Sequence, residues 1–209
     1  VVDANRRKSI AANHSATHLM HQALKDVVGI QVNQRGSLND SERLRFDFSS
    51  NKPISMNDIQ KVEQIVNKHI LEDTIVDTRM MDLEEAKKIG AQALFGEKYE
   101  NEVRVVLMGF NSFLDAKSSS FRERFSMELC GGTHVQRTGM IGSFIIKSEM
   151  ASSSGVRRIE ALTGMNAIKY LQLNRLYIDQ ITSMLKIPIE AVDERLNSLL
   201  TEKRTLTQK

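Results

Sequence analysis

The chain has 209 residues, of which 41% are hydrophobic, enough to bury the core of one main domain with a smaller appendage. It contains no run of eighteen apolar residues, so we expect no membrane span. The single cysteine excludes an internal disulfide framework, which is typical of a cytoplasmic protein. The formal net charge is only +3, but the basic residues occur in clusters that can attract a polyanion, while the absence of Trp disfavours a base-stacking surface for single strands.

Hydrophobic periodicity and turn residues divide the chain into helices and mostly hairpin-connected strands. Gly29 is a C-cap signal that ends the first helix, and Ser55 is an N-cap signal that starts the second. In chain order the predicted elements are helix 10–28, strands 31–38 and 43–48, helix 55–71, strand 74–81, helix 83–89, strand 103–108, strands 142–148 and 156–162, and a helix from 165 onward. We therefore expect an α+β fold in which a mostly antiparallel sheet is packed with helices.

The remaining segments are less regular. Residues 111–124 are rich in serine and charge and predict a surface loop, and His69 is predicted to be a surface residue. Apolar residues of the tail recur at alternating three- and four-residue steps, which fits packing against another helix and equally against the chain's own domain. They are Ile189, Val192, Leu196, Leu199 and Leu206. We predict one domain over residues 1–164 and a helical extension over residues 165–209.

Two pairs of metal-ligating residue types share a four-residue spacing, His14 with His18 and Cys130 with His134. On a helix, side chains four residues apart lie on one face with their Cβ atoms about 5–6 Å apart, close enough to share an ion. Imidazole nitrogen and thiolate sulfur are ligands that Zn²⁺ prefers. The alternative is a set of coincidental histidines and a buried cysteine. The matched pairs predict a single zinc site with these four residues as ligands.

Two common classes of zinc site do not fit this pattern. A zincin protease places Glu directly after the first histidine as general base, and Ser15 stands there. A zinc finger keeps its pairs within a couple of dozen residues, whereas more than a hundred separate His18 from Cys130. The two pairs must therefore meet by tertiary folding.

Longer sequence segments around both pairs resemble those of the alanyl-tRNA synthetase family. They are Arg6–His14, Thr17–His21, Gly36–Leu38, Arg43–Phe48, Ala93–Tyr99, Glu128–His134 and Gly155–Gly164. Together they extend over nearly the whole predicted domain. The four ligand positions alone also occur in threonyl-tRNA synthetase editing domains and in free-standing alanyl editing proteins, and the longer segments favour the alanyl enzyme. Segment 111–124 is longer than expected for this family.

The resemblance implies an editing domain that hydrolyses mischarged Ser-tRNA(Ala) and Gly-tRNA(Ala) at a site with one Zn²⁺. Glycine is smaller than alanine and serine adds only a hydroxyl, so a binding pocket discriminates weakly and a second, hydrolytic site is needed. The parent enzyme would ligate alanine to tRNA(Ala) with ATP in a core that lies upstream of this segment. Zinc would activate water, orient the substrate, or only organise the pocket, since four protein ligands are typical of structural sites.

The same resemblance implies a substrate pocket beside the zinc ligands. Thr17 would sense the seryl hydroxyl and Gln34 would line the pocket, although a Thr17 bonded only to its own helix is an open alternative. Gly131 and Gly132 would let the backbone approach the terminal ribose and its ester, with Thr133 next to them.

The implied partner is the acceptor end of tRNA(Ala), with basic residues around the mouth of the pocket. The expected contacts are Arg35, Arg45, Arg157 and Arg158. The chain starts without an initiator methionine, so we expect a piece of a longer protein, with the rest of the synthetase acting in cis and C-terminal regions forming oligomers. Two competing interpretations are a free-standing trans-editing deacylase and a non-catalytic, zinc-stabilised RNA-binding module.

Overall fold

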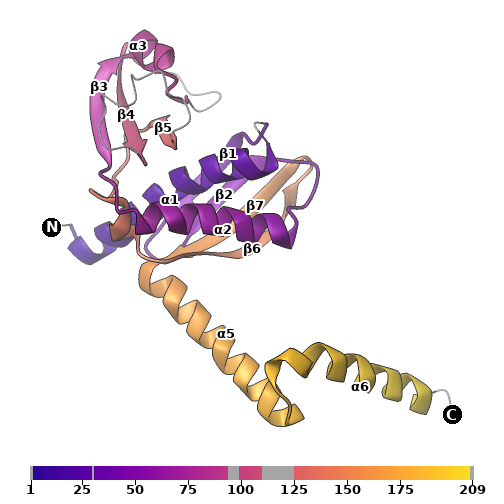
Figure 1. Ribbon diagram of the computed structural model, residues 1–209. Helices are drawn as coiled ribbons and strands as arrows, with labels where there is room; N and C mark the ends of the chain where they lie inside the picture. The colour runs from indigo at the N-terminus through magenta and orange to yellow at the C-terminus, as the bar shows by residue number, and fades with distance from the viewer. Residues whose placement is uncertain (1, 30, 94–98, 110–124, 208–209) are drawn as a thin grey trace. The chain divides into compact units, whose positions relative to one another are not determined.

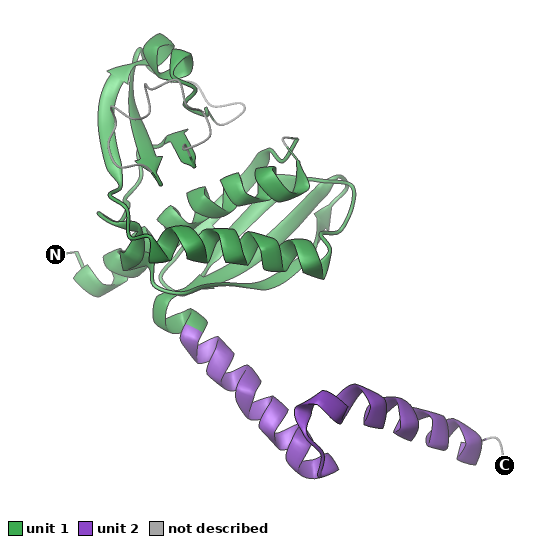
Figure 2. Ribbon diagram, viewed as in Figure 1, with its two compact units in different colours: residues 1–167 green, residues 168–209 purple. Residues whose placement is uncertain are grey.

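The computed structural model describes residues 2–29, 31–93, 99–109 and 125–207. The chain forms two compact units, residues 1–167 and 168–209 (Figure 2). The first unit contains helices α1 (Ala4–Val28), α2 (Met56–Leu71) and α3 (Leu83–Lys88) and two antiparallel sheets. The strands are β1 (Gln34–Asn39), β2 (Leu44–Ser49), β3 (Asp77–Asp82), β4 (Glu102–Met108), β5 (Ser126–Leu129), β6 (Phe144–Ser153) and β7 (Val156–Thr163). The α+β prediction, with antiparallel strands and helices, is confirmed.

The larger sheet has the strand order β1-β2-β7-β6, and α1 and α2 lie over one of its faces (Figure 1). Strand β2 shows why the helices pack there. Its residues Leu44, Phe46 and Phe48 are fully buried and join the core of α1, which includes Leu19 and Leu24. Alternate residues of a strand point to opposite faces, so the charged residues of β2 lie on the face away from the helices. The core therefore fixes α1, with its histidines, against the sheet.

The smaller sheet has the order β3-β4-β5 and its own apolar core, which includes Val103, Val105 and Leu107 of β4. Strand β4 is the central strand of this sheet, because it pairs with both neighbours. Strand β5 is the element that leads directly into the second ligand pair. Its backbone is held by β4 on one side and by a bridge from Gln92 to Glu128 on the other.

The predicted start of the first helix at residue 10 is wrong. Helix α1 begins at Ala4, where the Asp3 side chain accepts hydrogen bonds from the backbone N–H groups of Asn5 and Arg6. The first two turns are polar and exposed and so lack the apolar periodicity on which the prediction relied. The end of the helix at Gly29 is confirmed, with φ of 128° at that residue. The cap of α2 at Ser55 is confirmed as well, since its side chain accepts from the Asp58 N–H.

Three strand boundaries and one surface prediction also differ. Strands β1 and β3 each begin three residues later than predicted, and β6 begins at Phe144 and continues to Ser153. His69 is not a surface residue: its side chain is 15% exposed and its ring centroid lies 3.7 Å from that of Phe125. The predicted surface loop 111–124 lies outside the described residues.

The second unit is helical. It contains most of α5 (Gly164–Leu185), a short 3-10 turn η3 (Ile189–Ala191) and α6 (Val192–Thr207). Several of its large apolar side chains are exposed, among them Leu176, Met184 and Leu206. Among the helices of the described ranges, none combines the length and the apolar character that a membrane crossing requires.

Candidate metal centre

The four predicted ligands come together in the first unit. His14 and His18 lie on successive turns of α1, and Cys130 and His134 lie on the segment that follows β5. One potential ligand atom from each residue lies within 4.8 Å of the other three. Cys130 Sγ is 3.4 Å from His14 Nε2 and 3.4 Å from His134 Nε2. A tetrahedral zinc site with ordinary bond lengths has N–S edges of about 3.6 Å, so the donor set fits a single ion.

Hydrogen bonds on the far side of two imidazole rings orient these ligands. The Nδ1 atom of His18 donates to Glu128 Oε2 at 2.8 Å, which leaves Nε2 directed at the cluster. His134 Nδ1 lies 3.1 Å from the hydroxyl of Ser15, which also accepts a hydrogen bond from the Val135 N–H. The serine that replaces the zincin glutamate is thus completely buried and positions a ligand.

The electrostatics of the cluster favour a thiolate. Burial raises the pKa of Cys130, but hydrogen bonds from His134, His14 and His18 outweigh it and lower the pKa to about 3. Burial lowers the pKa of His18, but the Glu128 carboxylate and Cys130 outweigh it and raise the pKa to about 10. Burial is the main cause that lowers the pKa of His134 to about 4. The thiolate and a neutral imidazole are the forms that bind a metal.

Gly132 and Arg104 determine the path of the turn between the second pair of ligands. A Cβ atom on Gly132 would lie 2.2 Å from Cε1 of His14, whereas one on Gly131 would meet nothing within 4 Å. The guanidinium of Arg104, from β4, donates to the carbonyl oxygens of Cys130 and Gly132. The glycine at 132 is therefore required by the ring of His14.

A cavity of about 220 Å³ opens beside the ligands. Besides His14, His18 and Cys130, its lining residues are Thr17, His21, Gln34, Ser37, Asn39, Glu128 and Leu129. Of the five residues expected in a substrate pocket, Thr17 and Gln34 line this cavity, whereas Gly131, Gly132 and Thr133 are not among its lining residues. The Thr17 hydroxyl lies 2.9 Å from the carbonyl oxygen of Asn13 and 2.7 Å from Oδ1 of Asn39.

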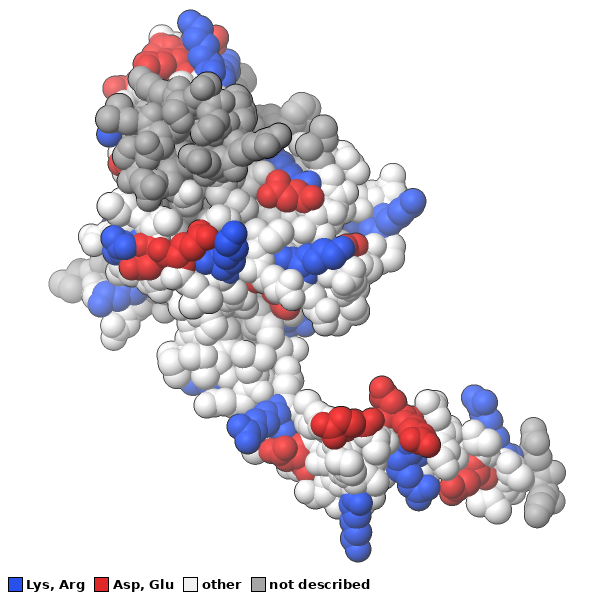
Figure 3. Space-filling model, viewed as in Figure 1, with Lys and Arg blue, Asp and Glu red and all other residues white. Residues whose placement is uncertain are grey.

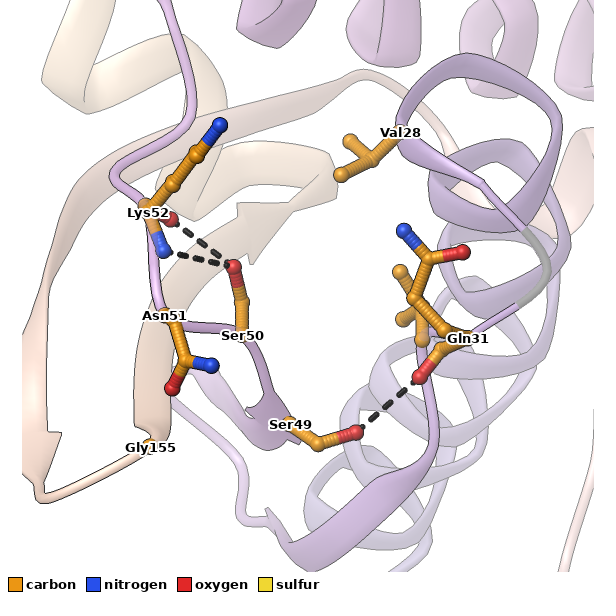
Figure 4. Close-up of a pocket in the computed structure, with 8 residues that line it drawn as sticks. Val28, Gln31, Ser49, Ser50, Asn51, Lys52 and Gly155 are labelled. Atoms are coloured by element: carbon orange, nitrogen blue, oxygen red, sulfur yellow. Dashed lines mark hydrogen bonds between the residues drawn. The ribbon is translucent and has the colours of Figure 1, made fainter.

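Two further hollows lie elsewhere in the first unit. Thr133 lines one of about 380 Å³ that also includes Arg7, Lys8 and His134, on another side of the ligand cluster. The other, of about 530 Å³, lies by the end of α1, where the Ser49 hydroxyl donates to the Gln31 carbonyl and the Ser50 hydroxyl to the Lys52 carbonyl (Figure 4). The second of these hollows contains none of the predicted ligands.

The four predicted RNA-contacting arginines lie on β1, β2 and β7. Arg157 is paired with Glu149 of β6, and Arg158 makes two hydrogen bonds of 2.7 and 2.8 Å to Asp47. The pKa of Asp47 is lowered, chiefly by these hydrogen bonds. Arg45 lies 3.8 Å from the same carboxylate. Arg35 is exposed, and within the described ranges no acidic side chain pairs with it.

The sequence analysis assigns no role to several residues of the site. Glu128 contacts two buried histidines, Asn39 contacts Thr17, and Arg104 holds the turn. Among these supporting residues only His21 is indicated by the sequence, because it lies on the same face of the helix as His14 and His18.

The fold and the ligand cluster agree with a match to a known family. Residues 103–160, which contain all of β4 except its first residue, β5 and the second ligand pair, match the second additional domain of threonyl and alanyl tRNA synthetases. Residues 103–160 thus correspond to an accessory domain that occurs in aminoacyl-tRNA synthetases.

Nearly the whole chain is similar to alanine–tRNA ligases. It is 52% identical to that of Dinoroseobacter shibae over 205 residues, 98% of this chain and 23% of the relative. It is 49% identical to that of Cereibacter sphaeroides over 207 residues (99% and 23%) and 48% identical to that of Psychrobacter cryohalolentis over 200 residues (96% and 22%). The chain belongs to the alanyl-tRNA synthetase family, as the region with its second additional domain, and spans less than a quarter of these relatives' length.

Proposed function

We propose that this chain is an editing hydrolase that cleaves the ester bond of Ser-tRNA(Ala) and Gly-tRNA(Ala). The observation that carries the proposal is the shared cavity, which joins a four-residue ligand cluster to Thr17 and Gln34. At about 30 Å³ per water, its volume of about 220 Å³ corresponds to roughly seven waters. A glycyl or seryl ester and an attacking water need no more room than that.

Thr17 is proposed to recognise the seryl group. Its hydroxyl hydrogen is directed to the carbonyl of Asn13 or to Asn39, so the oxygen's remaining lone pairs can accept from the hydroxyl of a bound serine. An alanyl methyl group in the same place would leave that acceptor without a partner, which disfavours the correctly charged tRNA. Gln34 and Asn39 offer further polar groups to the amino group and the ester.

The ligand cluster is proposed to hold one Zn²⁺ through His14, His18, Cys130 and His134. A bound Zn²⁺ would polarise an oxygen or nitrogen of the substrate, or a water. The protein's own contribution is to hold the ester beside the cluster and to surround it with buried side chains. Such positioning is worth orders of magnitude in rate.

The acceptor end of tRNA(Ala) is the proposed partner, bound through phosphate contacts. Arg35 is the favoured contact, because phosphates need not displace a carboxylate to reach it. Arg45, Arg157 and Arg158 remain proposed contacts that would have to exchange Asp47 or Glu149 for a phosphate. Figure 3 shows positive and negative side chains interspersed on the face in view, so this face carries no broad positive field.

Deacylation of Ser-tRNA(Ala) and Gly-tRNA(Ala), with Ala-tRNA(Ala) as the control substrate, tests the proposal. We expect the wild-type chain to hydrolyse the first two and to spare the third. Cys130→Ala removes one ligand and little volume, so we expect it to stay folded, to bind tRNA(Ala) and to lose deacylation. A folded, fully active Cys130→Ala variant would refute the proposed site.

A non-catalytic, zinc-stabilised RNA-binding module is the second candidate. The set of four protein ligands favours it, because closed zinc sites are usually structural. The same assay separates the two functions: this module would bind tRNA(Ala), release no amino acid, and unfold when Cys130 is replaced. A trans-editing deacylase would share the activity and differ in lacking the ligase core within its own polypeptide.

A further inference from the structure

Glu128 connects two buried histidines inside the first unit. One of its carboxylate oxygens accepts from Nδ1 of His18 at 2.8 Å, and the other lies 3.0 Å from Nδ1 of His21. The side chains of His18, His21 and Glu128 are only 6%, 5% and 6% exposed. His21 is not a member of the ligand cluster.

We propose that Glu128, braced by His21, is the positioning residue of the metal centre: it fixes the His18 ring so that Nε2 points at the ion. The inference rests on the metal centre proposed above. It assigns roles to two residues outside the four ligands.

The backbone of Glu128 is held on both sides of its strand. Strand β5 pairs Glu128 with Val106 of β4, and Gln92 bridges its other side through hydrogen bonds with Met127 and Leu129. The carboxylate therefore reaches α1 from a rigid strand. Cys130 follows two residues later, so one short segment supplies a ligand and the support for another ligand.

The geometry on the helix is equally specific. His18 and His21 are three residues apart on α1, so both rings lie on the face that meets β5. The second nitrogen of His21 lies 3.4 Å from the carbonyl oxygen of Val32, which limits rotation of that ring. His21 thus holds one carboxylate oxygen and leaves the other for His18.

A carboxylate at this depth is costly unless hydrogen bonds compensate for the lost water. A well-packed apolar residue could connect α1 to β5 without that cost. A carboxylate, however, fixes the tautomer and orientation of a ligating imidazole and raises its basicity, and loss of such a partner typically weakens metal binding about 10–100-fold.

The zinc affinity of the folded 209-residue chain tests the inference without tRNA. Competition with a chromophoric chelator gives the dissociation constant, and the absorption spectrum of the Co²⁺ form reports ligand geometry. We expect Glu128→Gln to raise the dissociation constant about 10–100-fold and to change the intensity of the Co²⁺ bands. His21→Gln should cause a smaller increase in the same direction.

Glu63→Gln is the matched control. Glu63 of α2 is also partly buried and accepts a hydrogen bond from the Ile146 N–H, but it does not contact the ligands. We expect it to bind zinc as the wild type does, whatever its effect on thermal unfolding. This comparison separates the positioning of a ligand from general stability.

The outcomes are distinct. A wild-type chain that binds zinc, with Glu128→Gln folded and unchanged in affinity, overturns the role of Glu128. If Glu128→Gln does not fold, unchanged affinity in His21→Gln overturns the inference and weakened affinity supports it. A wild-type chain that binds no zinc overturns the metal centre itself and this inference with it.

Discussion

Replacement of Gly132 by alanine should damage the metal centre through a single methyl group. The added Cβ would lie 2.2 Å from Cε1 and 2.6 Å from Nδ1 of His14. Ordinary carbon–carbon contacts begin at about 3.5 Å, so the ring is about 1.3 Å too close. It must rotate away and withdraw its ligand nitrogen, or the turn held by Arg104 must shift.

Either response has a measurable size. Overpacking of this kind costs about 1–3 kcal/mol of folding free energy, which lowers Tm by roughly 2–12 °C in a chain of this length. If the ring rotates instead, zinc affinity falls because one of four ligands is lost. Zinc competition titrations, together with thermal unfolding measured with and without the metal, distinguish the two responses.

Gly131→Ala is the matched control one residue earlier, since nothing lies within 4 Å of its added methyl group. Exposed substitutions of this kind usually change stability by less than about 0.5 kcal/mol, and zinc affinity should be unchanged. Equal behaviour of the two variants in both assays would refute the steric reasoning.

Three further outcomes are expected. Replacing Thr17 with a bulky residue should reduce discrimination between seryl and alanyl esters in the deacylation assay while zinc content stays at the wild-type value; lost zinc would contradict the assignment. Arg35→Ala should weaken tRNA(Ala) binding and make the negative slope of log affinity against log salt less steep by about 1, whereas replacement of the exposed Lys61 of α2 by alanine should change neither. Zinc must replace a proton on His18, whose metal-free pKa is about 10, while Cys130, with a pKa of about 3, is already a thiolate at neutral pH. Zinc affinity should therefore rise from pH 7 to 9, with about one proton released from His18 per ion; calorimetry in buffers of different ionisation enthalpy measures it, and an affinity that falls over this range would contradict the sign.

The sequence predicts those parts of the fold that short-range patterns encode. Alternating apolar residues locate β2, and the residue types that cap helices locate Ser55 and Gly29. The sequence does not locate the start of α1. The first two turns of this helix are polar and exposed, and the hydrogen bonds of the Asp3 cap hold them in place without apolar packing. Periodicity carries no information about such a segment.

The ligand residues can be proposed from their spacing, but their supports cannot. Glu128 and His21 are 107 positions apart, and their contact exists only after α1 packs beside β5. The same is true of Gly132, whose need for a hydrogen atom in place of a side chain comes from the ring of His14. Residue type and spacing identify donors of a metal site, whereas their orientation is a property of the tertiary structure.

The separation of 116 positions between His14 and Cys130 also affects the timing of biosynthesis. A ribosome adds about 5–20 residues per second, so the first pair of ligands precedes the second by roughly 6–23 seconds. During that interval α1 can form, but no ion can be held by all four side chains. Capture of the metal is therefore a late event, which can occur only after most of the polypeptide of this domain has been synthesised.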